Sequence, residues 1–219
     1  MIRLHHCPQT RSMRTLWLLY ELGIEFEVIT HAFGKNLRDP KYLSIAPSGR
    51  VPSLEIDGKS LIETGAIAEY LCDRFSPDDL GRSPGHSERA EWLVWMHFAE
   101  TISQHAAALT QQHIALREDH MRSPIVMKLE AARIGKCFDA LEHRLTGREY
   151  LLDGGFSAAD VSVGQAVYMA SFFARFDDRT NLAAWYDRIS NRPAFQASLP
   201  EENMRLFTED FFETWGEQA

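Results

Sequence analysis

The 219-residue chain has few cysteines, a shortage of positive charge and no long apolar run. Its three cysteines (Cys7, Cys72 and Cys137) form no CxxC pair. We therefore expect neither a disulfide framework nor a structural zinc site, and a reducing cytoplasm fits best. The 23 basic residues against 31 acidic ones give a net charge of −8, which argues against a nucleic-acid binder. No segment approaches the roughly 20 apolar residues of a membrane span, and the first residues lack the apolar segment of a signal peptide.

Histidines are numerous in the second half, but their spacing does not favour a metal site. Helices that ligate metals favour histidine pairs four residues apart. The histidines at 97, 105, 113 and 120 contain no such pair. We expect no bound metal.

The charge is divided unevenly along the chain. Residues 1–75 contain nine basic and nine acidic residues, whereas residues 76–219 contain 14 basic and 22 acidic ones. All of the excess negative charge therefore lies in the second part. This asymmetry, with 45% apolar residues overall, favours two domains with different surfaces.

Residues 1–76 are predicted to form an α/β domain with the order β-α-β-α-β-β-α. This prediction rests on short β-prone runs, on apolar residues at helical spacing and on the hairpin signal Asp57-Gly58. The predicted strands are Ile2–His5, Phe26–Ile29, Ser53–Ile56 and Lys59–Ile62. The predicted helices are one through Met13, Leu16, Trp17 and Tyr20 that ends at Gly23, a short one at Asp39–Leu43, and Thr64–Phe75.

Residues 77–86 are rich in proline and glycine and are predicted to be a linker. Residues 87–219 show no convincing strand and are predicted to form an all-helical domain of five or six helices. Four of these are Glu88–Thr110, Ile125–Leu145, Ser157–Phe173 and Leu182–Asn191. The aromatic tail, which either caps a substrate pocket or forms an amphipathic helix, contains Phe207, Phe211, Phe212 and Trp215.

Two short motifs together predict a site for a small zwitterionic peptide. In the first, Arg50-Val51-Pro52 precedes a strand. A cis peptide bond at Pro52 would leave the Val51 backbone N–H and C=O free to pair with an extended peptide. In the second, Glu63-Thr64 opens a helix, whose free N–H groups receive a carboxylate well. Glu63 can accept the α-amino group of such a peptide, and Thr64 can donate to its α-carboxylate.

These motifs, in the form VPSL and ETGAI, resemble the glutathione-binding signature of the cytosolic glutathione transferases. The resemblance covers essentially the whole chain and implies a thioredoxin-like domain followed by an all-helical one. Its class stays open among bacterial-type, theta-, zeta- and beta-like enzymes. The resemblance also implies that Val51 pairs with the cysteinyl backbone of glutathione, and that Arg50 meets its glycine carboxylate. A cytoplasmic homodimer with glutathione as co-substrate and a role in detoxification would follow.

A second match to that family is the segment Phe156-Ser157-Ala158-Ala159-Asp160. Ser157 and Asp160 have the spacing of a capping box at a helix N-terminus. Its role is structural, so Asp160 is not expected to act as a catalytic acid.

Glutathione chemistry needs the thiolate, so the protein must present hydrogen bonds or positive charge to the sulfur. The family uses a tyrosine, serine or cysteine between the first strand and the first helix, and this segment has no tyrosine. Counting back from Arg14 puts the activating position at Thr10, or at Gln9 in some classes. Ser12 is a second candidate, and both hydroxyls can instead cap the helix.

Three functions remain open at this point. The first is attack of the glutathione thiolate on a small hydrophobic electrophile, with an isomerase or dehalogenase as variants. The second is a thiol transferase or disulfide reductase that uses Cys7, because Cys7-Pro8-Gln9-Thr10 resembles a single-cysteine CPxx motif. The third is a non-catalytic glutathione-binding regulatory protein.

Overall fold

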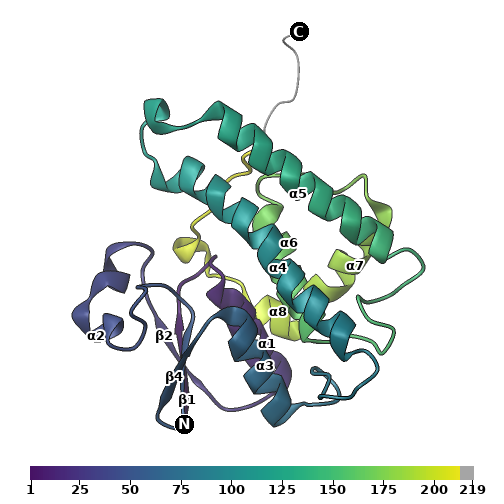
Figure 1. Ribbon diagram of the computed structural model, residues 1–219. Helices are drawn as coiled ribbons and strands as arrows, with labels where there is room; N and C mark the ends of the chain where they lie inside the picture. Colours follow the sequence, from purple (N-terminus) through teal and green to yellow (C-terminus); the bar gives the residue numbers. More distant parts are fainter. Residues whose placement is uncertain (213–219) are drawn as a thin grey trace.

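The computed structural model describes residues 1–212, apart from the side chains of Lys35 and Asn36. A small mixed sheet with its helices is followed by a larger helical part (Figure 1). The strands are β1 (Ile2–His6), β2 (Glu27–Thr30), β3 (Ser53–Ile56) and β4 (Lys59–Ile62). The helices are α1 (Ser12–Leu22), α2 (Pro40–Leu43), α3 (Thr64–Phe75), α4 (Arg89–Thr110), α5 (Pro124–Arg144), α6 (Ala158–Ala170), α7 (Thr180–Ser190) and α8 (Pro193–Ser198). Short 3₁₀ or π turns are Lys35–Arg38, Gln111–Ala115, Asp119–Met121 and Glu202–Met204.

The sheet has the strand order β2-β1-β3-β4. β1 pairs parallel with β2 and antiparallel with β3, and β3 forms a hairpin with β4. Asp57 and Gly58 both have positive φ in the two-residue turn between β3 and β4, as a hairpin of this length requires. The predicted order β-α-β-α-β-β-α is confirmed, and residues 76–88 separate it from the helical part.

Trp17 of α1 joins the two parts of the molecule in one core. α1 packs on α3 and also on α6 and α8. Trp17 is fully buried, and its ring meets Phe195 edge-on at 4.8 Å. A Cβ atom at Gly164 of α6 would lie 3.0 Å from the Trp17 ring, so this glycine permits the close approach of the helices. The first helix therefore has a fixed position against the helical part.

The helical part is centred on α6, which is buried along nearly its whole length. α4 packs against α6 and α5 (Figure 1). The predicted capping box is present at the start of α6: Asp160 accepts from the backbone N–H of Ser157 at 3.0 Å, and Ser157 Oγ accepts from the backbone of Ala159. Asp160 also accepts from Leu151 N–H and from Trp185 Nε1, so its role is structural as predicted.

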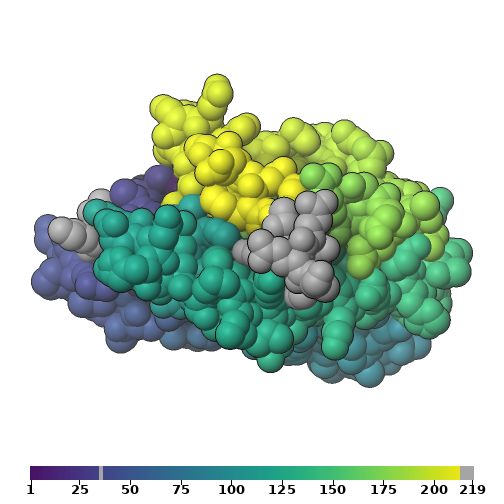
Figure 2. All heavy atoms as spheres, turned by 90° about the horizontal axis from the view of Figure 1, so that it is seen from above, coloured from purple at the N-terminus to yellow at the C-terminus, as the bar shows by residue number. Residues whose placement is uncertain are grey.

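The C-terminal segment differs from one of its two predicted alternatives. Residues 205–212 contain no helix, so an amphipathic helix there is wrong for this stretch; Trp215 lies outside the described residues. Phe207 is buried and stacks on Phe172 with ring centroids 5.0 Å apart. The segment lies on the surface beside the last helices (Figure 2). Within residues 1–212, no helix is long and apolar enough to cross a membrane.

Candidate glutathione site between the sheet and the helices

A cavity of about 640 Å³ lies between the β1–α1 loop and the helices α4 and α6. Three predicted site residues, Thr10, Arg50 and Val51, line it together. The remaining wall is mixed, and its apolar residues are Phe33, Leu37, Ala106, Ala107, Ala108, Ala115, Met169 and Leu206. Such a cavity has the size and character of a small-molecule site.

Thr10 lies in the loop that leads into α1 and is partly exposed. Thr10 Oγ1 donates to the carbonyl of Cys7 at 2.7 Å and lies 2.8 Å from Ser12 Oγ. The hydroxyl is thus held by the loop while its residue lines the cavity. This position allows a hydrogen bond to a ligand sulfur in the cavity.

Ser12 is the first residue of α1 and is completely buried. Its hydroxyl does not cap the helix. Ser12 Oγ accepts from the backbone N–H of Cys7 at 3.0 Å and lies 2.8 Å from Nδ1 of His6. Ser12 does not line the cavity, so its hydroxyl acts within the loop.

Cys7 follows β1 and is only 1% exposed. Burial raises the pKa of its thiol to about 11. A thiol with this pKa remains protonated at neutral pH and is a poor nucleophile. Cys72 and Cys137 are also buried, and none of the three forms a disulfide.

Val51 and Pro52 are joined by a cis peptide bond, as the peptide-binding interpretation requires. Pro52 is buried, whereas Val51 is partly exposed and lines the cavity. The turn before them is held by Tyr42, whose hydroxyl donates to the carbonyl of Arg50 at 2.5 Å. Arg50 is exposed and lines the cavity, where its guanidinium can meet an anionic group.

Glu63 and Thr64 open α3 but do not line the 640 Å³ cavity. Glu63 is exposed and has φ of 71°, a left-handed value that is costly for a residue other than glycine and is often found at functional sites. Thr64 is buried, and its hydroxyl accepts from Nη1 of Arg14 at 2.8 Å.

Arg14 connects Thr64 to the helical part. The same Nη1 atom donates to Glu100 on α4 at 2.6 Å, and Nη2 donates to Ser103 at 2.9 Å. Burial alone would raise the pKa of the Glu100 carboxyl, but the guanidinium groups of Arg14 and Arg11 outweigh it and hold that pKa below its usual range. These hydrogen bonds of Arg14 therefore hold the start of α3 in a fixed position relative to Ser103, which forms part of the cavity wall.

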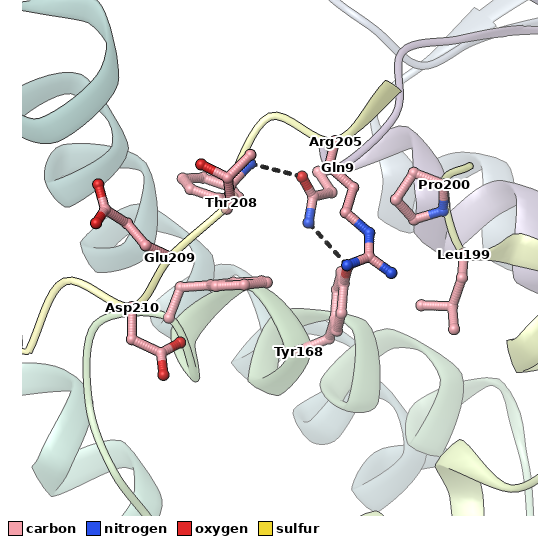
Figure 3. A pocket seen from close by; sticks show the side chains of 10 residues that line it. Gln9, Tyr168, Leu199, Pro200, Arg205, Thr208, Glu209 and Asp210 are labelled. Carbon is pink, nitrogen blue, oxygen red and sulfur yellow. Dashed lines mark hydrogen bonds between the residues drawn. The ribbon is translucent and has the colours of Figure 1, made fainter. Parts of the chain in front are cut away.

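Gln9 has a role that the sequence did not suggest. Its φ is 48° and its side chain is buried. Its amide Nε2 donates to the hydroxyl of Tyr168 on α6, while its Oε1 accepts from the backbone N–H group of Phe207 (Figure 3). The same oxygen also accepts from the backbone N–H group of Leu206. Gln9 thus attaches the C-terminal segment to the β1–α1 loop, and Leu206 forms part of the cavity wall. A smaller cavity of about 360 Å³ lies beyond Gln9.

Comparison with known proteins identifies the family. The glutathione S-transferase N-terminal domain model matches residues 1–73, and the C-terminal domain model matches residues 103–188. Glutathione S-transferase F13 of Arabidopsis thaliana is 30% identical over 85% of this chain and 89% of its own length. The glutathione S-transferase of Silene vulgaris is 30% identical over 90% of this chain and 96% of its own. The chain belongs to the glutathione S-transferase family.

Solved structures agree with the fold of this glutathione transferase. The glutathione transferase URE2P8 of Phanerochaete chrysosporium, determined with oxidized glutathione, superposes with a TM-score of 0.81. It is 22% identical, and the alignment covers 90% of this chain and 92% of that one. The theta class enzyme of Xanthomonas axonopodis, determined with glutathione, gives a TM-score of 0.78 at 23% identity, covering 90% and 96%. The predicted thioredoxin-like and all-helical fold is confirmed.

No group of three or more histidine, cysteine, aspartate or glutamate side chains within residues 1–212 is arranged to hold a metal ion.

Proposed function

We propose that the 640 Å³ cavity is where the thiolate of glutathione attacks a small, apolar electrophile. The observation that carries this proposal is the joint presence of Thr10, Arg50 and Val51 in a cavity that also presents apolar side chains such as Phe33 and Met169. Glutathione is the co-substrate. Its sulfur forms a bond to an electrophilic carbon, the leaving group departs with its bonding electrons, and the thiol proton passes to solvent.

Thr10 is the proposed activating residue. A hydroxyl donor favours the charged form of the sulfur and so lowers the thiol pKa. Ser12, the other predicted candidate, is buried behind Thr10 and supports it from within the loop. The buried and protonated thiol of Cys7 argues against a disulfide reductase that uses this residue.

The tripeptide is proposed to extend from Glu63 and Thr64 past Val51 to Arg50. The cis peptide bond at Pro52 supports backbone pairing at Val51, and the exposed Arg50 supports contact with a carboxylate. Thr64 is proposed to meet the γ-glutamyl carboxylate through the free backbone N–H groups at the N-terminus of α3.

We further propose a cytoplasmic homodimer that detoxifies its electrophilic substrates. Exposed apolar side chains on two long helices support self-association, including Val94 of α4 and Leu129 of α5. The free, buried cysteines are compatible with a reducing compartment. Sedimentation at increasing protein concentration tests the dimer, because a monomer at all concentrations would refute it.

Calorimetric titration with glutathione and turnover of an activated aryl chloride test the proposal together. We expect glutathione to bind saturably, and we expect chloride and the thioether product to form in equimolar amounts. Glu63→Ala should weaken binding about tenfold, since a hydrogen bond to a charged group is worth about 1.5–3 kcal/mol. Glu25→Ala, which removes an exposed carboxylate outside the site, should bind like the wild type. Absence of glutathione binding at millimolar concentration would refute the function.

A further inference from the structure

A chain of hydrogen-bonding groups leads from a buried histidine to Thr10. His6 Nδ1 lies 2.8 Å from Ser12 Oγ, which lies 2.8 Å from Thr10 Oγ1. His6 and Ser12 are both buried, while Thr10 is partly exposed in the cavity. The chain therefore connects the interior of the molecule to the hydroxyl of a residue that lines the cavity.

The number of hydrogens on these groups limits how the chain can be arranged. Ser12 Oγ has one hydrogen and two lone pairs. One lone pair accepts the backbone N–H of Cys7. If His6 Nδ1 has no hydrogen, Ser12 must donate to it, and the remaining lone pair of Ser12 attracts the hydrogen of Thr10 inward. If His6 Nδ1 carries the hydrogen, it donates to Ser12, and Ser12 donates to Thr10 Oγ1 or to the carbonyl of Cys7.

We propose that His6, acting through Ser12, orients the Thr10 hydroxyl so that its hydrogen points at the thiolate of glutathione. This inference rests on the proposed function of Thr10. In this arrangement the donors run in one direction, from His6 to Ser12 to Thr10 to sulfur. Each bond polarises the next, which strengthens the last donor. His6 and Ser12 are positioning residues, since neither one lines the cavity.

The state of His6 is compatible with this role. Burial lowers the pKa of His6 to about 4, so the ring is neutral at pH 7 and carries one hydrogen on one of its two nitrogens. A neutral ring can donate from Nδ1 without placing a second charge beside the thiolate. The Thr10 hydroxyl can donate to the Cys7 carbonyl when no thiolate is bound, and rotation about one bond turns it to the sulfur.

Two substitutions at His6 distinguish a role in orienting the Thr10 hydroxyl from a role in filling space. The side-chain amide of asparagine can place a donor where Nδ1 lies, whereas leucine fills a similar volume without one. We expect His6→Leu to raise the thiol pKa of bound glutathione by about one unit, measured from the ultraviolet absorbance of the thiolate against pH. At pH 6.5 kcat should fall up to about tenfold, with the KM for glutathione nearly unchanged. His6→Asn should restore most of both values.

His5 supplies the matched control. It is buried on the same strand, but it faces the other side of the sheet, where it contacts Glu55 and His31. His5→Leu should leave the thiol pKa at the wild-type value. If His6→Leu fails to fold, Ser12→Ala removes only the connecting hydroxyl and should raise the thiol pKa in the same way.

The outcomes distinguish this inference from the proposed function. If Thr10→Val raises the thiol pKa but the folded His6→Leu and Ser12→Ala proteins do not, the orienting role of His6 is refuted and the role of Thr10 stands. If Thr10→Val also leaves the thiol pKa unchanged, the proposed activation by Thr10 fails, and the role of His6 fails with it.

Discussion

At the scale of single residues, the site uses a threonine hydroxyl whose surroundings are almost entirely local. Thr10 is held by Cys7 and Ser12, both within three residues of it in the chain. A hydroxyl has only one hydrogen, so Thr10 can donate to a ligand only if that hydrogen is not already donated to a neighbouring acceptor. The loop before α1 therefore has to control direction as well as position.

Replacing Thr10 with valine removes the hydroxyl and keeps the branched shape. We expect kcat/KM to fall about 10- to 100-fold at pH 6.5, because a hydrogen bond to a charged group contributes about 1.5–3 kcal/mol. Thr10→Ser retains the hydroxyl and should keep most of the activity. Steady-state kinetics measure both, and equal activity of the valine variant would contradict the proposed role.

Cys7 provides a test of the rival chemistry. Cys7→Ala removes a thiol that burial keeps protonated, so transfer of glutathione to an aryl chloride should stay within about twofold of the wild type. Loss of turnover in a folded Cys7→Ala protein would instead favour chemistry at that sulfur.

At the scale of elements, the sequence predicts what depends on neighbouring residues and misses what depends on distant ones. The β3–β4 turn, the capping box of α6 and the main helices follow from local patterns, and the structure contains them. α8 was not among the four helices predicted for this part, although its first residue, Pro193, is well suited to the first turn of a helix. The links from Gln9 to Tyr168 and Phe207 span 159 and 198 residues, so no local pattern indicates them.

In the site too, features set by neighbouring residues were predicted and features set by distant residues were not. The motifs around Val51 and Glu63 were recognisable from the sequence, and three of the predicted residues meet in the cavity. The burial of Ser12 was not predictable, because it results from packing of the loop against the interior. The engagement of Thr64 by Arg14 and Glu100 likewise depends on where α4 lies.

Gly164 tests the packing of α1 on α6. A Cβ atom there would lie 2.5 Å from Ile189 and 3.0 Å from Trp17, so Gly164→Ala should lower the free energy of unfolding by about 1–3 kcal/mol. Gly135 of α5 is the control, because its nearest contact would be 3.9 Å away. Gly135→Ala should be neutral or stabilising by up to about 1 kcal/mol. Urea unfolding measures both, and equal effects of the two changes would contradict the packing argument.

At the scale of the whole molecule, Arg14 is one of the charged links between the sheet part and the helical part. It is buried, and Glu100 on α4 supplies the opposing charge. A buried cation without such a partner is costly. The same pair also positions Thr64, so the stability of the molecule and the geometry of the glutathione site are connected.

This link predicts a pH dependence of stability. The pKa of Glu100 is depressed in the folded protein, because Arg14 and Arg11 outweigh the effect of burial. Its contribution is therefore present above the ordinary pKa of 4.5 and is lost as the pH falls through the folded value. Glu100→Gln should be less stable than the wild type at pH 7, and the difference should shrink as the pH falls below 4.5.

Urea unfolding at a series of pH values measures this difference. Asp153→Asn is the control, since it removes an exposed carboxylate paired with Arg148 and should change stability by no more than about 1 kcal/mol. A Glu100→Gln difference that does not vary with pH would contradict the ion-pair explanation.

The most direct test of the proposed site is a crystal structure of the protein with glutathione bound. The sulfur is expected to lie within hydrogen-bond distance of Thr10 Oγ1, with the backbone of Val51 paired to the tripeptide. A sulfur held by another side chain, or a tripeptide bound away from Thr10 and Val51, would contradict the account.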